Sequence, residues 1–154
     1  MVKDIFSQIA EYNIRQASPT PFKTVLLVVD MQKYFGEIAE PILENVTSLI
    51  RGCRENGIKV LFTRHGHKSK IDGSMMSKWW GDLIKYGSEE WEIIDGIEVP
   101  PEDIIDKSRY SAFHRTDLDL RLQNAGVKDI IISGVLTNCC VETTARSAFD
   151  HDYG

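Results

Sequence analysis

Four short apolar runs, rich in Val, Ile and Leu, constrain the fold of this chain more than any other feature. They are KTVLLVVD at 23–30, IKVLFT at 58–63, DIIDK at 103–107 and KDIIISG at 128–134. Runs of this kind are typical of strands that are buried on both faces. Segments with apolar residues at helical spacing follow the first, third and fourth runs, at 41–56, 116–126 and 138–150. Strands that alternate with helices predict a three-layer α/β/α, doubly wound, mainly parallel sheet.

The length of the chain suits one domain, which we place at residues 1–154. Residues 1–20 form an N-terminal leader, in which 4–14 have the pattern of an amphipathic helix. A polar, Trp-rich insertion at 64–101 interrupts the alternation and has no pattern that predicts its structure. We expect this insertion to border the substrate pocket.

Composition argues against several classes of protein. The formal net charge of -5 disfavours general binding to nucleic acids or to membrane surfaces, which both favour a basic face. No apolar run approaches the roughly 18 residues of a transmembrane helix, and the acidic N-terminus makes a poor signal peptide. Three cysteines, Cys53, Cys139 and Cys140, are too few and odd in number for a disulfide framework. We therefore expect a cytoplasmic protein with a small-molecule substrate.

The residues that follow each predicted strand carry the chemistry. Ligands of parallel α/β sheets bind beyond the carboxyl ends of the strands. Asp30 ends the first strand, Arg64 and His65 follow the second, Lys107 ends the third, and Leu136–Cys140 follow the fourth. An acid, a cation and a thiol therefore face the same edge of one sheet.

These three groups suit a cysteine hydrolase. A thiol attacks as the thiolate, and its ordinary pKa of about 8.5 leaves little thiolate at neutral pH. A helix N-terminus and the Lys107 ammonium would both favour the anion, while Asp30 can take the thiol proton and deliver it to a leaving amine. We therefore predict that Cys140 is the nucleophile and that Asp30 and Lys107 assist it.

Three blocks of sequence carry a resemblance to a known family: LLVVDMQKYF at 26–35, KSRYSAFHRTDLDLRLQNAG at 107–126 and SGVLTNCCVETTARSAFD at 133–150. With them the chain resembles the isochorismatase-like cysteine hydrolases, a Rossmann-like family that includes isochorismatases, nicotinamidases and N-carbamoylsarcosine amidohydrolase. The resemblance implies that Asp30, Lys107 and Cys140 form a catalytic triad. It assigns the neighbouring Cys139 a packing role.

The resemblance also implies features around the triad. A non-proline cis peptide at Val135–Leu136 would direct the N–H groups of Leu136 and Cys140 into an oxyanion hole. Family members are commonly dimers or tetramers, so we expect a homo-oligomer. The family pattern continues past DHDYG, at 150–154, into a last parallel strand and helix, which we do not expect to find in this chain.

Two chemistries occur among such proteins. Isochorismatases hydrolyse a vinyl ether to release pyruvate and carry glycine in place of Cys140, whereas the amidohydrolases use the cysteine to form a thioester-type intermediate. The segment RYSAFHR is closer to the isochorismatases, but His65 and Leu136 replace their pocket Gln and turn Tyr. Because the nucleophile is retained, we predict C–N hydrolysis of a small amide or carbamoyl compound. The alternatives are vinyl-ether hydrolysis and non-catalytic binding of a small molecule or partner.

Aromatic and polar residues near the same edge are the expected substrate contacts. They are Gln32, Phe35, His65, Trp80, Tyr110 and Phe113. Trp80 is preferred to Trp79 because it aligns with a pocket Trp of isochorismatases. Aromatic side chains over a strand-end pocket more often line it than pack on the surface.

The pair His65 and His67, in TRHGH, raises the question of a metal. Nicotinamidases bind a metal through an Asp and several His that follow this strand. Two His at this spacing, with only Asp72 as a conceivable partner, are a weak ligand set. We therefore expect no metal and no other cofactor, and interpret the pair as polar groups at the pocket mouth.

Overall fold

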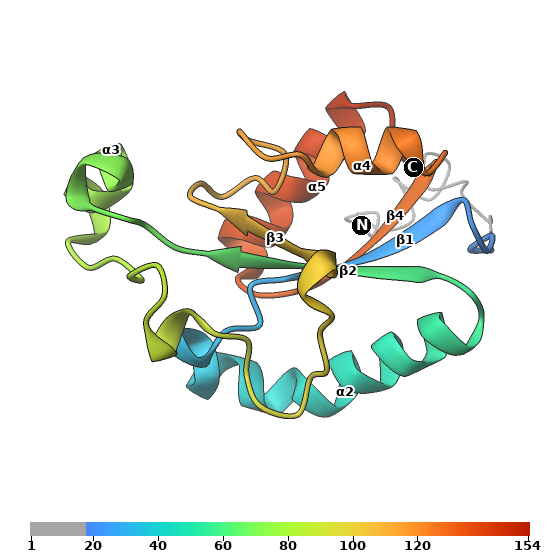
Figure 1. The fold of residues 1–154 in the computed structure, drawn as a ribbon, viewed down its shortest axis with the longest axis horizontal. Coiled ribbons are helices and arrows are strands. Elements are labelled where there is room, and N and C mark those ends of the chain that lie inside the picture. The colour runs from blue at the N-terminus through green and yellow to red at the C-terminus, as the bar shows by residue number, and fades with distance from the viewer. Residues whose placement is uncertain (1–17) are drawn as a thin grey trace, which may run out of the picture.

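Four parallel strands form one sheet in the order β3-β2-β1-β4 (Figure 1). They are β1 at Thr24–Val29, β2 at Lys59–His65, β3 at Ile104–Lys107 and β4 at Asp129–Gly134. All four predicted strands are therefore confirmed. The computed structural model describes residues 18–154, so the helix predicted at 4–14 lies outside the described residues.

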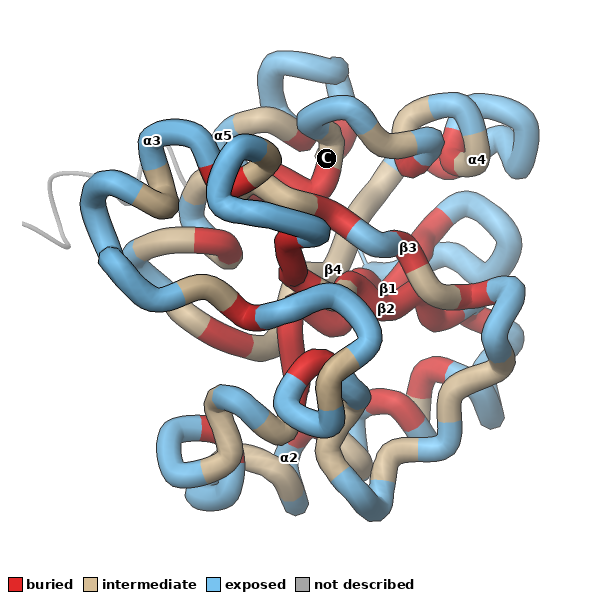
Figure 2. The backbone as a smooth tube through the Cα atoms, turned by 60° about the vertical axis from the view of Figure 1, so that its left-hand side comes forward, coloured by how far each residue is buried: buried red, intermediate tan, exposed pale blue. Residues whose placement is uncertain are grey.

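Strand β1 shows why polar and apolar residues do not alternate along these runs. Val25, Leu27 and Val29 point into a core cluster shared with the helices that follow β3 and β4. Leu26 and Val28 point to the opposite face, into a cluster shared with the helix that follows β1. Both faces are covered, so every residue of the strand is buried (Figure 2). The expected three-layer α/β/α arrangement is confirmed.

Helix α2, at Gly36–Glu55, covers one face of the sheet (Figure 1). It begins five residues before the predicted segment 41–56, so Pro41 lies inside the helix instead of at its start. Proline inside a helix removes one backbone hydrogen bond, here from the second turn. The helix ends where predicted: Gly57 has a φ of 71°, and the Ile58 N–H donates to the Cys53 carbonyl at 2.9 Å. This is the glycine-ended C-cap that reverses the chain towards β2.

The opposite face of the sheet is covered by the C-terminal half of the chain (Figure 1). Helix α4 spans Leu118–Asn124, and a π-helical turn at Thr137–Val141 leads directly into α5 at Glu142–Asp150. Both helices were predicted, although the π-helical turn was not. That turn places Cys140 between the end of β4 and the start of α5.

The insertion at 64–101 contains a helix that sequence did not predict. Helix α3, at Lys70–Trp80, projects from the body of the molecule (Figure 1). Its large apolar residues Ile71, Met75 and Trp79 are exposed. The rest of the region holds two short 3-10 turns, Glu89–Trp91 and Pro101–Asp103, and a third turn at Lys33–Phe35 follows β1. No helix among residues 18–154 is long and apolar enough to span a membrane.

The sheet reverses its direction of growth between β1 and β4. The chain adds β2 and β3 on one side of β1 and then places β4 on the other side. Gly134, at the end of β4, pairs with Val29 and has a φ of 117°. A Cβ at this position would collide with the Val29 backbone, so only glycine permits this close approach. Ligands of doubly wound sheets bind at such a switch point.

Candidate active site

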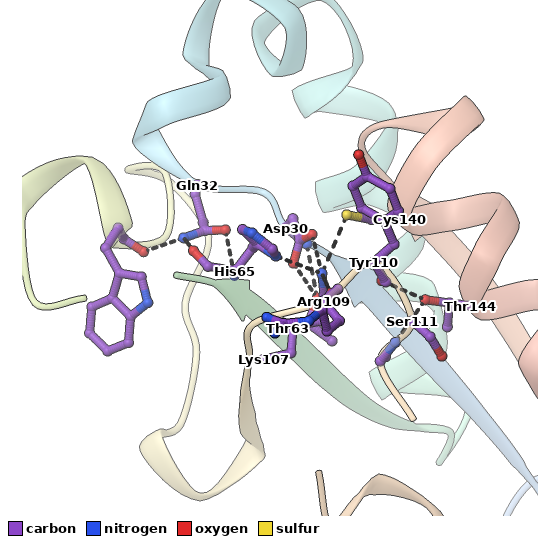
Figure 3. Close-up of polar contacts among 12 residues, drawn as sticks. Asp30, Gln32, Thr63, His65, Lys107, Arg109, Tyr110, Ser111, Cys140 and Thr144 are labelled. Carbon is purple, nitrogen blue, oxygen red and sulfur yellow. Dashed lines mark hydrogen bonds and ion pairs between the residues drawn. The ribbon is translucent and has the colours of Figure 1, made fainter. Parts of the chain in front are cut away.

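The side chains of Asp30, Lys107 and Cys140 meet beyond the carboxyl ends of the strands (Figure 3). Lys107 Nζ lies 2.7 Å from Asp30 Oδ2 and 3.4 Å from Cys140 Sγ. All three residues are buried. The structure thus brings together the acid, the cation and the thiol that were predicted from three distant segments of sequence.

Asp30 is held by the end of β2 as well as by its own strand. Its backbone N–H donates to Thr63 Oγ1 at 3.2 Å, and the Thr63 hydroxyl donates in turn to Asp30 Oδ1 at 2.6 Å. The residue has a φ of 49°, in the left-handed region that Asp tolerates better than most residues. The two hydrogen bonds therefore fix both the backbone and the carboxylate of Asp30.

Lys107 is the last residue of β3 and pairs in register with His65 of β2. Its ammonium also donates to the Arg109 carbonyl at 3.1 Å. Burial alone would lower the pKa of Lys107, but the Asp30 carboxylate and the Cys140 sulfur outweigh it and raise the pKa above its ordinary value. Lys107 is therefore a permanent cation between an acid and a thiol.

Cys140 is a thiol at rest in this site. Burial raises its pKa to about 12, and the neighbouring Asp30 carboxylate acts in the same direction, while Lys107 opposes both. This differs from our expectation that a helix N-terminus and Lys107 would favour the thiolate. A carboxylate beside the sulfur stabilises the protonated form, and it is also the group placed to accept that proton.

The turn that precedes Cys140 contains the expected cis peptide, Val135–Leu136. The N–H groups of Cys139 and Val141 both donate to the Leu136 carbonyl, at 3.1 Å each. Leu136 and Cys140 themselves border the cavity described next. The assignment of their N–H groups to an oxyanion hole stays a prediction.

A cavity of about 400 Å³ opens onto Cys140. Four expected substrate contacts line it: Phe35, His65, Trp80 and Tyr110. The Trp80 indole N–H donates to the Tyr110 hydroxyl at 2.7 Å, which ties the insertion to the segment after β3. Sequence reasoning missed the other lining residues, which are Tyr34, Ile38, Met76, Asp82, Leu83, Ile84 and Cys139. Their nearness to Phe35, Trp80 and Cys140 in the chain was the available signal.

Two expected substrate contacts lie elsewhere. The Gln32 side chain is buried and bound to backbone: it accepts from the His65 N–H at 2.8 Å and donates to the carbonyls of His65, at 3.0 Å, and Trp91, at 2.7 Å (Figure 3). Phe113 stacks on His151, with ring centroids 4.8 Å apart, in the cluster on the α4–α5 face. Neither residue lines the cavity. Cys139, which we expected only to pack, does line it.

Histidine, acid and thiol groups approach one another closely enough to suggest a metal. Ligand atoms of Asp30, His65 and Cys140 lie within 4.8 Å of one another. However, the Lys107 ammonium contacts all three residues, and a second cation there would be repelled. His67 lies on the other side of His65, with their Nε2 atoms 3.0 Å apart. The pair therefore offers only two facing nitrogen atoms, fewer than the three protein ligands of an ordinary catalytic zinc site.

A second, larger groove of about 760 Å³ lies at the amino ends of the strands. Phe22, Lys59, Val99 and Pro100 are among its lining residues. It contains none of the residues predicted for function and lies at the opposite edge of the sheet from Cys140. The chemistry of the molecule is therefore assigned to the smaller cavity.

Comparison with known proteins agrees with this geometry. Residues 24–154 match the isochorismatase domain family model. The chain is 44% identical over 147 residues to Nicotinamidase 3 of Arabidopsis thaliana, covering 93% of this chain and 74% of that protein. It is 30% identical over 165 residues to the ureidoacrylate amidohydrolase RutB of Acinetobacter baylyi, covering 86% of this chain and 67% of that protein.

Among solved structures, a cysteine hydrolase from Pseudomonas syringae pv. phaseolicola 1448A matches with a TM-score of 0.83 and 30% identity. The match covers 90% of this chain and 71% of that chain. The matched family model spans all four strands of the sheet. The chain therefore belongs to the isochorismatase family and is a hydrolase.

Proposed function

We propose that this enzyme hydrolyses the C–N bond of a small, uncharged amide through a covalent Cys140 intermediate. The observation that carries the proposal is the contact of Lys107 with both Asp30 and Cys140, where the Cys140 thiol borders a mainly apolar cavity. A nucleophile, a proton acceptor and a fixed cation are the parts that this reaction needs.

The first half of the reaction forms the thioester. Asp30 takes the thiol proton as Cys140 Sγ attacks the carbonyl carbon, and Lys107 stabilises the negative charge that moves away from the carboxylate. The N–H groups of Leu136 and Cys140 hold the oxyanion, a contribution of about 3 kcal/mol for each donor. Asp30 then gives the proton to the leaving nitrogen, and ammonia or an amine departs.

The second half releases the acid. Asp30 takes a proton from water, and the hydroxide attacks the thioester carbon. The tetrahedral intermediate expels the Cys140 sulfur, which regains its proton from Asp30. The overall balance is one amide and one water to one carboxylic acid and one ammonia or amine.

The lining of the cavity supports an uncharged, flat substrate. Among the described residues no Lys or Arg lines it, and Asp82 adds a negative charge at its edge. Phe35, Trp80 and Tyr110 offer aromatic faces. A primary amide on an aromatic ring, such as nicotinamide, fits these features and agrees with the name of the 44% identical relative. A substrate with carboxylates, as vinyl-ether hydrolysis of isochorismate requires, would enter without a cationic partner.

The test is a turnover screen by mass spectrometry with nicotinamide, N-carbamoyl amino acids and isochorismate. We expect turnover of nicotinamide that is lost in Cys140→Ala and kept in Cys139→Ala, the matched control, because both thiols border the cavity. Amide turnover that survives in Cys140→Ala would refute the nucleophile. Isochorismate turnover that survives it would establish the vinyl-ether reaction instead.

We also propose that the enzyme is cytoplasmic and forms a homo-oligomer, a dimer or tetramer. The exposed apolar residues Ile71, Met75 and Trp79 of α3 support assembly. The three cysteines are free in the structure, as expected in a reducing compartment. Static light scattering of the purified protein would give the number of subunits, and a monomeric mass at micromolar concentration would refute assembly.

A further inference from the structure

A line of polar contacts leads from the triad through His65, which borders the cavity, to His67 and Asp72, which do not. Lys107 Nζ lies 3.5 Å from His65 Nδ1, His65 Nε2 lies 3.0 Å from His67 Nε2, and His67 Nδ1 lies 3.7 Å from Asp72 Oδ2. His65 and His67 are buried, 7% and 2% exposed, whereas the Asp72 side chain is 38% exposed. The line therefore runs from the catalytic cation to the surface.

The ends of this line decide where the protons lie. The Lys107 ammonium can only donate, so His65 Nδ1 must accept from it. Burial lowers the pKa of His65 to about 4, so its ring carries one proton, which then lies on Nε2. His65 Nε2–H donates to His67 Nε2, and the single proton of His67 then lies on Nδ1, facing the Asp72 carboxylate.

The opposite arrangement conflicts with both ends. It would place an Nδ1–H of His65 against the Lys107 ammonium and an Nδ1 lone pair of His67 against the Asp72 carboxylate. Among residues 18–154, the Arg109 carbonyl favours this arrangement: it lies near His65 and, besides accepting from Lys107 at 3.1 Å, has a second lone pair. The positive charge of the Lys107 ammonium, 3.5 Å from His65 Nδ1, opposes a proton on that nitrogen. Within residues 18–154, His67 Nδ1 has no hydrogen-bond partner, and the charge of the Asp72 carboxylate, 3.7 Å away, orients this nitrogen.

We propose that His67 and Asp72 are positioning residues, which fix His65 in the tautomer that accepts from Lys107 and so hold the ammonium between Asp30 and Cys140. The inference rests on the roles given to these three residues in the proposed function. Neither His67 nor Asp72 lines the cavity, so they act through His65 and without touching the substrate.

The same geometry separates this chain from a metal-binding arrangement. In the inferred tautomer the Nε2 of His65 carries a proton that the Nε2 of His67 accepts, so zinc would have to break this hydrogen bond and displace the proton to bind both atoms. The Asp72 carboxylate lies on the Nδ1 side of His67, away from the facing nitrogen atoms. We infer that a hydrogen bond between two imidazoles takes the place of a metal here.

Several charges surround His67 and set its response to pH. Asp72 favours the protonated ring, whereas burial, Arg109 and Lys107 disfavour it, with the net result that the pKa of His67 is lowered. Its neighbour His65 stays neutral above a pH of about 4. The backbone of Lys85 also pairs with that of His67. A protonated His67 cannot accept a hydrogen bond from His65. We therefore expect the line of contacts to break, and kcat to fall, when the pH drops low enough to protonate His67.

Kinetics of four variants test the positioning role. In His67→Leu the acceptor is lost, and we expect kcat for nicotinamide to fall about tenfold with KM changed less than twofold, as for residues that orient a catalytic group. His67→Gln keeps an acceptor oxygen and should recover most of kcat. Asp72→Asn should lower kcat. It should also shift the acid limb of the pH dependence of kcat to lower pH, because the carboxylate that favours protonated His67 is gone. His114→Gln, at an exposed histidine, is the control and should match the wild type.

The outcome that contradicts the proposal is a fall in kcat of equal size in His67→Leu and His67→Gln, with an unmoved acid limb in Asp72→Asn. Such a result would indicate that His67 only fills space. Circular dichroism of each variant would show whether it folds. If His67→Leu does not fold, His67→Gln and Asp72→Asn still decide between the two roles.

A measurement without substrate separates this inference from the proposed function. Two-bond 1H–15N correlation spectra report imidazole tautomers directly, and we expect Nε2–H for His65 and Nδ1–H for His67. This holds even if nicotinamide proves not to be a substrate. Detection of an Nδ1–H on His65 would overturn the inference. So would one equivalent of zinc chloride shifting the Nε2 signals of both rings, whereas unchanged signals support it.

Discussion

The Asp30 carboxylate and the Lys107 ammonium lie 2.7 Å apart, and neither side chain is exposed to solvent. Desolvation of two charges is costly, so such a pair contributes little net stability compared with apolar residues. Loss of one partner is different, because it leaves the other charge buried and uncompensated. The pair therefore couples the chemistry of the site to the stability of the fold.

Lys107→Met should lower the free energy of unfolding by about 3–5 kcal/mol, because it leaves the buried Asp30 carboxylate without a counter-charge. Urea denaturation followed by circular dichroism measures this loss. The control is Arg146→Met, whose guanidinium pairs with Glu142 at 2.6 Å on the surface, with side chains 76% and 50% exposed, and which should cost less than about 1 kcal/mol. Adding Asp30→Asn to Lys107→Met should restore part of the lost stability. Equal losses for Lys107→Met and Arg146→Met would contradict the argument.

Alkylation of Cys140 by iodoacetamide should be slow at pH 7 and accelerate as the pH rises, because burial and Asp30 raise the pKa of the thiol to about 12. In Asp30→Asn the pKa of Cys140 falls. We expect labelling at pH 8 to be about tenfold faster, because a fall of roughly one pKa unit raises the thiolate fraction about tenfold. Turnover should nevertheless be lost in this variant, because no group accepts the proton.

Mass spectrometry of labelled peptides measures the rates, in a Cys139→Ser background that leaves one thiol in the relevant peptide. Cys53, a buried cysteine of α2, is the internal reference. Fast labelling of Cys140 that does not change between pH 6 and pH 8 would instead indicate a thiolate at rest.

Stability should depend on pH through His65. Its pKa is about 4 in the folded protein and 6.5 ordinarily, with burial as the main cause. Below pH 6.5 the unfolded chain binds a proton that the folded protein does not, so the free energy of unfolding falls as the pH drops from 6.5 to 4. The His65 share of this loss is about 3 kcal/mol.

The measurement is the change in the free energy of unfolding between pH 7 and pH 4.5, compared between the wild type and His65→Gln. We expect a smaller change in the variant, since it lacks the titrating group. His114→Gln, at an exposed position, should reproduce the wild-type change. Identical pH dependence in all three proteins would show that His65 does not titrate in this range.

Trp80→Ala should raise KM for an aromatic amide by about tenfold, because the substrate loses an aromatic face and Tyr110 loses its hydrogen-bond donor. The value of kcat should change little, since Trp80 touches none of the three catalytic groups. Trp79→Ala is a close control: the neighbouring ring is 77% exposed and does not line the cavity. Equal effects of the two substitutions would mean that α3 as a whole, and not Trp80, shapes the site.

The strands and the shared edge of the site were predictable from sequence, because both follow from short-range pattern and from topology. The apolar runs are typical of strands covered on both faces, which holds for β1 and most of β2, whereas β4, at an edge of the sheet, is only half-buried. The rule that ligands bind beyond strand ends then places Asp30, Lys107 and Cys140 together, although they are far apart in the chain.

Side-chain direction and the insertion were not predictable in the same way. Gln32 follows β1 closely, yet its amide points away from the cavity to the backbone of Trp91. Helix α3 gave no signal because its apolar residues, such as Ile71 and Met75, face solvent and not the core. Pro41 suggested a late start for α2, but the helix accommodates it in its second turn. Distant contacts decide these features, and local pattern does not report them.

The hydrogen bonds of Gln32 bear on how new activities can arise on this scaffold. The Gln32 amide hydrogen-bonds to the backbone N–H and carbonyl of His65, beside the catalytic residues, and to the backbone carbonyl of Trp91 in the insertion. A backbone carbonyl remains whatever side chain its residue carries. The side chains of the insertion can therefore be substituted, or the segment replaced by that of a relative, while the hydrogen bond from Gln32 to the backbone at position 91 is kept. Substitutions in the insertion can therefore change substrate selectivity without disturbing the catalytic residues, because the Gln32 amide connects the two regions through backbone atoms alone.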